Sequence, residues 1–186
     1  MMPLFQRDIR IQLAVALGTA LGTAVGEQAI HLPARQADAS VHVPRGCDPA
    51  RALATDYGSL YGAPLVSSVQ LENGWLLLTF TDALFDALVG QINATLPLPA
   101  SDGGEHAVNR MLALGRHAGE GCPPLPAFRR ALLEAVSADQ SPAAYRRAAR
   151  AAETLFLSIP PRERPAWMDR SGAYARALAR LLGDKR

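Results

Sequence analysis

The chain has 186 residues, of which 49% are hydrophobic and 19% are charged. This length is enough for a hydrophobic core in one domain or two small ones, and the composition excludes an intrinsically disordered chain. The formal net charge is only +2, but its distribution along the chain is uneven.

The two halves of the chain carry opposite charge. Residues 1–101 contain 5 Arg and 8 acidic residues, net −3, whereas residues 102–186 contain 14 Lys and Arg against 9 acidic residues, net +5. A basic half is suited to a polyanionic partner such as a nucleic acid. Because Lys185 is its only lysine, the same pattern also fits arginines that alternate with alanine on solvated helix faces. Both interpretations stay open.

The N-terminal segment predicts a first helix over residues 4–26, with Gly26 at its end because glycine commonly ends helices. Leu13, Leu17 and Leu21 recur at helical spacing, which favours an amphipathic helix,. A charged start, an apolar run and small residues near Ala24 are also typical of a secretory signal peptide, which is the alternative. The apolar run is shorter than the ~20 residues of a bilayer span, so no membrane contact is expected.

Cys47 and Cys122 lie far apart, and the sequence has no CxxC pair,. Such cysteines are typical of ordinary thiols in a reducing compartment, so we expect a cytoplasmic protein. In a secreted protein the two would be able to form one long-range disulfide.

Two short alternating segments, residues 29–32 and 40–43, predict two strands joined by a polar connection,. Asp48 as N-cap and Pro49 at the first helical position predict the start of a second helix. Leu53, Tyr57 and Leu60 are expected to form the buried stripe of this helix, and Gly62 is expected to end it.

A β-hairpin is predicted next, with residues 66–72 and 75–80 as its strands. Asn73-Gly74 is a strong hairpin signal, because both central positions of a two-residue turn need a positive φ. Thr81 or Asp82 then caps a third helix. The residues of this helix that are expected to face inward are Leu84, Phe85, Leu88 and Ile92.

The best predicted linker is the segment that contains Pro97 and Pro99, followed by "ASDGG",. Every periodic segment after it is helical. The predicted fold class is therefore α+β, with a small N-terminal α+β domain that contains an antiparallel hairpin, followed by an all-α helical bundle. The predicted domain bounds are residues 1–97 and 102–186.

No motif for a reaction centre is present in the sequence. His31 and His42 are expected on adjacent strands, but the residues around them form no recognised metal-ligand motif,. GxSxG, GxGxxG and GxxxxGK[ST] patterns are all missing,. We therefore expect no catalytic residues, no metal, no cofactor and no enzymatic activity.

A family resemblance follows from the order of the N-terminal parts. A helix, two strands, a helix that begins with "DPARALA" and the segment "VSSVQLENGWLLLTFTDALFDALVGQI" resemble the N-terminal additional domain of arginyl-tRNA synthetases. Leu77 departs from the family, which usually has Asn at that position. The residues that match its hairpin pattern are Gly74, Trp75, Leu76, Leu78, Thr81 and Asp82.

The second half resembles the DALR-type anticodon-binding domain of the same enzymes. "EHAVNRMLALGRHAG" is similar to its opening helix, with Arg110 on the motif's arginine. His106, Val108 and Asn109 replace the usual Tyr, His and Ala. Only "TLPLPASDGGE" joins the two parts, so the synthetases' nucleotide-binding catalytic domain is missing.

The resemblance implies a non-catalytic protein that binds tRNA or a structured RNA. Independently of the resemblance, the helical periodicity of the second half allows Tyr145, Trp167 and Tyr174 to form aromatic stacking surfaces for RNA. The alternative is a solvated face with Tyr145 and Trp167 half-buried in the bundle. One alternative is a protein-interaction module that keeps these folds without RNA and binds a synthetase or another protein; a second is a secreted helical protein. The candidate phosphate contacts are Arg110, Arg116, Arg129, Arg130, Arg146 and Arg147.

Overall fold

The computed structural model describes residues 5–96, 129–130, 132–133, 177 and 180. The chain divides into two units, one of Leu4–Leu88 and one of Met1–Pro3 with Val89–Arg186. Almost all of the first unit is described.

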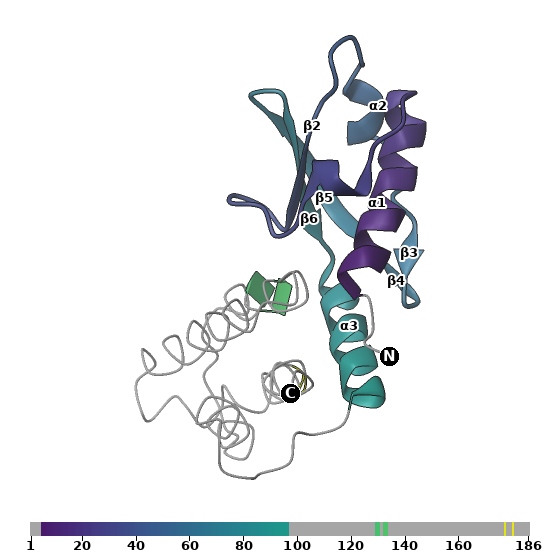
Figure 1. The fold of residues 1–186 in the computed structure, drawn as a ribbon, viewed down its shortest axis with the longest axis vertical. Helices are drawn as coiled ribbons and strands as arrows, with labels where there is room; N and C mark the ends of the chain where they lie inside the picture. The colour runs from purple at the N-terminus through teal and green to yellow at the C-terminus, as the bar shows by residue number, and fades with distance from the viewer. Residues whose placement is uncertain (1–4, 97–128, 131, 134–176, 178–179, 181–186) are drawn as a thin grey trace. The chain divides into compact units, whose positions relative to one another are not determined.

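A four-stranded antiparallel sheet is the centre of the first unit (Figure 1). Its spatial order is β1-β2-β6-β5, so the two N-terminal strands pair with one side of the later hairpin. Val41 lies opposite both Ile30 and Leu76, and alternating apolar residues therefore line up across the sheet,. The four strands are β1 (Ile30–His31), β2 (Ala39–His42), β5 (Val66–Glu72) and β6 (Trp75–Phe80).

Helix α1 (Phe5–Leu21) lies on one side of this sheet (Figure 1). Ile9, Leu13 and Leu17 are 0% exposed, which confirms the predicted amphipathic helix,. The helix ends at Leu21, and Gly22 follows with a φ of 66°, which suits a glycine after a helix,. The predicted end at Gly26 is wrong, and a short 3₁₀ turn, η1 (Glu27–Ala29), follows instead.

The hairpin is confirmed with the predicted strands and turn. Asn73 and Gly74 have φ values of 51° and 80°, as a tight two-residue turn requires,. Glu72 pairs with Trp75, and Leu71 pairs with Leu76.

The predicted second helix is wrong beyond its first turn. Helix α2 (Ala50–Leu53) is followed by β3 (Ser59–Leu60) and β4 (Ala63–Pro64), which form a separate two-stranded sheet. Asp48 Oδ1 accepts a hydrogen bond of 2.9 Å from Ala50 N–H, but the N-cap is Pro49, so the helix starts one residue after the predicted position. Gly58 and Gly62 have φ values of 71° and 81°, which a helix does not allow,.

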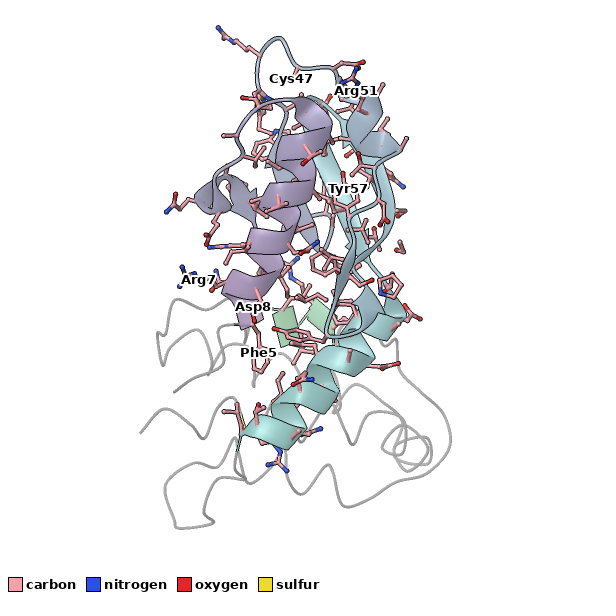
Figure 2. The ribbon with its side chains drawn as sticks, turned by 90° about the vertical axis from the view of Figure 1, so that its right-hand side faces the viewer. Phe5, Arg7, Asp8, Cys47, Arg51 and Tyr57 are labelled. Carbon is pink, nitrogen blue, oxygen red and sulfur yellow. The ribbon has the colours of Figure 1, made fainter. Side chains whose placement is uncertain are left out.

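Hydrogen bonds of two tyrosines anchor this turn-rich segment to α1. Tyr57 OH donates a hydrogen bond of 2.8 Å to Ala52 O, and Gln12 Nε2 on α1 donates one of 3.2 Å to Tyr57 O. Tyr61 OH donates a hydrogen bond of 2.7 Å to Asp8 Oδ2, also on α1. Asp8 and Tyr57 are labelled beside α1 in Figure 2. Polar bonds to α1 therefore replace the apolar helix stripe that the spacing predicted.

Helix α3 (Asp82–Thr95) begins at the predicted position. Leu84 N–H donates a hydrogen bond of 3.0 Å to Thr81 Oγ1, so Thr81 is the capping residue,. The four residues predicted to face inward are all buried: Leu84, Phe85, Leu88 and Ile92.

The predicted fold class is wrong. The described residues form an N-terminal helix, an antiparallel sheet of four strands and one further long helix, not a hairpin domain with a full second helix. The apolar alternation of β2 matches that of β6, and this pairing extends the hairpin into a sheet,. The predicted bundle falls almost wholly on residues outside the described part of the chain.

A few described residues of the second unit are helical: 129–130, 132–133, 177 and 180. Within this unit, Arg180 Nε donates a hydrogen bond of 3.0 Å to Asn93 Oδ1. Among the helices that the structure describes, none combines the length and the apolar composition that a bilayer crossing needs.

Candidate functional site

The four-stranded sheet has a second face, which points away from α1 and which we call the outer face. Strand alternation places a side chain on it at every second position. In β6, Leu76 and Leu78 are buried on the core side, while Trp75, Leu77 and Thr79 keep some exposure. The pairing register adds residues from the other three strands: His31, Ser40, His42, Gln70 and Glu72.

Three aromatic rings gather on the outer face. The ring centroids of His31 and Trp75 are 5.3 Å apart, and those of His42 and Trp75 are 5.2 Å apart. Both contacts are edge-type, with interplanar angles of 62° and 83°,. The two histidines are exposed and Trp75 is half-buried. We call this group the aromatic cluster.

An open hollow of about 430 Å³ adjoins the aromatic cluster. Its lining includes the exposed cation Arg35, the exposed anion Glu72 and the neutral polar side chains of Gln36 and Ser40. Ser40 is 7% exposed, although it lies on the outer face. The hollow therefore offers stacking surface and both signs of charge.

Asp38 fixes the connection that carries Arg35 and Gln36. Its Oδ2 accepts a hydrogen bond of 2.8 Å from Phe80 N–H, and its backbone N–H donates one of 3.1 Å to Leu78 O. Its carbonyl oxygen accepts a bond of 3.2 Å from Ala34 N–H. These bonds close the connection between β1 and β2 beside β6, so Arg35 and Gln36 stay at the rim of the hollow.

This arrangement suits recognition of a planar, polar ligand. Aromatic rings stack on nucleobases, an arginine pairs with phosphate, and amide or carboxylate groups form hydrogen bonds with base edges. Within residues 5–96 and the few others described, no group of three or more His, Cys, Asp or Glu side chains is arranged to hold a metal ion.

The predicted phosphate contacts fall mostly outside the described residues. Arg110, Arg116, Arg146 and Arg147 all lie there. Arg129 and Arg130 are helical and half-buried, and each already has an interaction partner in the protein. As RNA contacts, all six stay predictions.

The aromatic cluster was not predicted from the sequence. His31 and His42 were expected on adjacent strands and Trp75 in the hairpin, but no sequence pattern brings the three residues together. The missing information was the pairing of β2 with β6, which sets His42 directly opposite Trp75. The signal was the matched alternation of residues 39–42 and 75–78.

No known family model, curated protein or solved structure matches the chain.

Proposed function

We propose that the chain is a non-catalytic RNA-binding protein, related to the tRNA-recognition domains of arginyl-tRNA synthetases. Its target is tRNA or a structured RNA that resembles it, and a cytoplasmic location belongs to the same proposal. The observation that carries it is the aromatic cluster beside Arg35 on the outer face.

The chemistry of the outer face supports this proposal. Stacking on aromatic side chains contributes about 1–3 kcal/mol per base and tolerates different sequences. Arg35 adds a cation for the phosphate that accompanies each base,. The basic half of the chain, net +5 over residues 102–186, supplies further attraction for a polyanion.

A filter-binding titration of the full chain against bulk tRNA, at about 50 and about 200 mM salt, tests the proposal. We expect affinity that falls steeply with salt and that weakens in Arg35→Glu. The matched control is Arg51→Glu, because Arg51 on α2 is also exposed but does not line the hollow; it should weaken binding less.

The sequence-predicted arginines provide a second arm of the same titration. Charge reversal at Arg146 and Arg147 together should reduce both the affinity and its salt dependence. If the native chain shows no tRNA binding at the lower salt concentration, the proposal fails. The protein-interaction module would then be the better hypothesis.

A further inference from the structure

Glu72 holds an unusual position for a carboxylate at a surface proposed to bind a polyanion. It pairs with Trp75 across β5 and β6, and opposed side chains on one face of a sheet have Cβ atoms about 5 Å apart,. Glu72 is exposed and lines the hollow together with Trp75 and Arg35. A base on the aromatic cluster would therefore present one edge to a carboxylate.

The nucleobases differ in what they offer to a carboxylate. An ionised carboxylate has two acceptor oxygens and no donor. The Watson–Crick edge of guanine carries two adjacent donors, N1–H and the N2 amino group, which match those oxygens. Adenine and cytosine each place an acceptor nitrogen beside their amino group, and uracil flanks its one N–H with two carbonyl oxygens. Guanine alone offers a carboxylate two adjacent donors with no acceptor between them.

We infer that Glu72 makes the outer face selective for guanine in an unpaired nucleotide; this inference rests on the proposed function. The nucleotide must be unpaired because base pairing occupies the edge that Glu72 would read. Charge also sets the orientation of the ligand. Glu72 repels phosphate and Arg35 attracts it, so the base edge faces Glu72 and the phosphate faces Arg35,.

The test is fluorescence anisotropy with labelled pentanucleotides of single-stranded RNA. The central base is guanine, adenine or inosine, and the other four are uracil. We expect the full chain to bind the guanine oligonucleotide about tenfold more tightly than the adenine one, as for a good bidentate contact. Inosine keeps N1–H and lacks the N2 amino group, so its affinity should lie between them.

Two variants locate this selectivity. Glu72→Gln replaces one acceptor oxygen by a donor, so the guanine-to-adenine affinity ratio should fall to about one. Glu27→Gln removes the same charge from η1, away from the hollow, and should leave the ratio unchanged. The ratio is measured within one variant, so a general change in net charge does not alter it.

The outcomes separate this inference from the proposed function. Equal affinity of the native chain for guanine and adenine, or a preference that survives Glu72→Gln, overturns guanine selectivity and leaves RNA binding in place. If none of the three oligonucleotides binds, and Trp75→Ala does not change tRNA affinity, the outer face is not an RNA site and guanine selectivity fails. The proposed function fails separately, if the native chain does not bind tRNA at the lower salt concentration.

Discussion

The two faces of the four-stranded sheet differ in almost every property, although they alternate along the same strands. On the core face, Leu76, Leu78 and Ala39 are 0% exposed. On the outer face, His31 and His42 are exposed around a half-buried Trp75. Neighbouring residues in β6 therefore differ in role: those on the core face stabilise the fold, and those on the outer face are accessible to a ligand. Single substitutions at adjacent positions test this division.

The largest effect is expected on the core face. Leu76→Ala should lower the free energy of unfolding by about 2–5 kcal/mol, because it leaves a cavity beneath α1. Urea denaturation measures this change. The matched control is Leu77→Ala, the next residue on the outer face, which is only partly buried and should cost about 1 kcal/mol,. Equal losses would contradict the division between the faces.

Trp75→Ala should show the opposite balance. Loss of the stacking surface should weaken tRNA binding about tenfold or more, measured by filter binding. The loss of stability should be smaller than for Leu76→Ala, because Trp75 is only half-buried. Trp75→Phe keeps an aromatic ring and should retain most of the affinity. Unchanged affinity in Trp75→Ala would assign the aromatic cluster to structure alone.

The turn between β5 and β6 affects both faces of the sheet, because it sets the register in which the two strands pair. Gly74 has a φ of 80°, so Gly74→Ala should cost about 1–2 kcal/mol of stability through backbone strain,. Space is not the problem, because a new Cβ would lie 3.6 Å from His42 Nε2, an ordinary contact. Denaturation of Gly26→Ala is the control: Gly26 has a φ of −74° and open space, so a similar loss there would exclude strain as the cause.

This turn also shows what the sequence was able to predict. Asn73-Gly74 is a local signal, and it specified both strands of the hairpin. A second turn of the same kind, at Tyr61 and Gly62 with φ values of 54° and 81°, was missed because tyrosine rarely adopts a positive φ,. Its hydrogen bond to Asp8 on α1 is a long-range contact that no local pattern reveals.

The candidate site was harder to predict for the same reason. The aromatic cluster combines residues from three strands, and its geometry depends on the pairing of β1 with β2 and of β2 with β6.

The apolar spacing at residues 53, 57 and 60 predicted a helix that the structure does not have. Of those three residues only Tyr57 is buried, and it belongs to a loop. Patterns within one element were informative, whereas contacts between elements needed the structure.

The smallest effect is expected at the loops on the α1 side, where the buried Tyr57 and the half-buried Tyr61 make the fold sensitive to alkali. Burial raises the pKa of Tyr57 from 10.0 to about 12. Burial, then the hydrogen bond and charge of Asp8, raise the pKa of Tyr61 as well. Above pH 10 the unfolded chain releases protons that the folded chain keeps, so it binds fewer protons and stability falls as pH rises. The contribution of Tyr57 is therefore complete below pH 10 and lost by about pH 12.

Tyr57→Phe isolates this contribution. At neutral pH it should cost about 1 kcal/mol, because Ala52 O loses its hydrogen-bond donor,. Between pH 10 and 12 the variant should lose less stability than the native chain, since it has no hydroxyl to ionise at this position. Denaturation across this range measures both slopes, and equal slopes would show that Tyr57 does not contribute.

Since Tyr57 lies away from the outer face, tRNA affinity at neutral pH should stay unchanged in this variant. A parallel loss of affinity would mean that the two faces are coupled, because a defect beneath α1 would then reach the aromatic cluster through the strands they share.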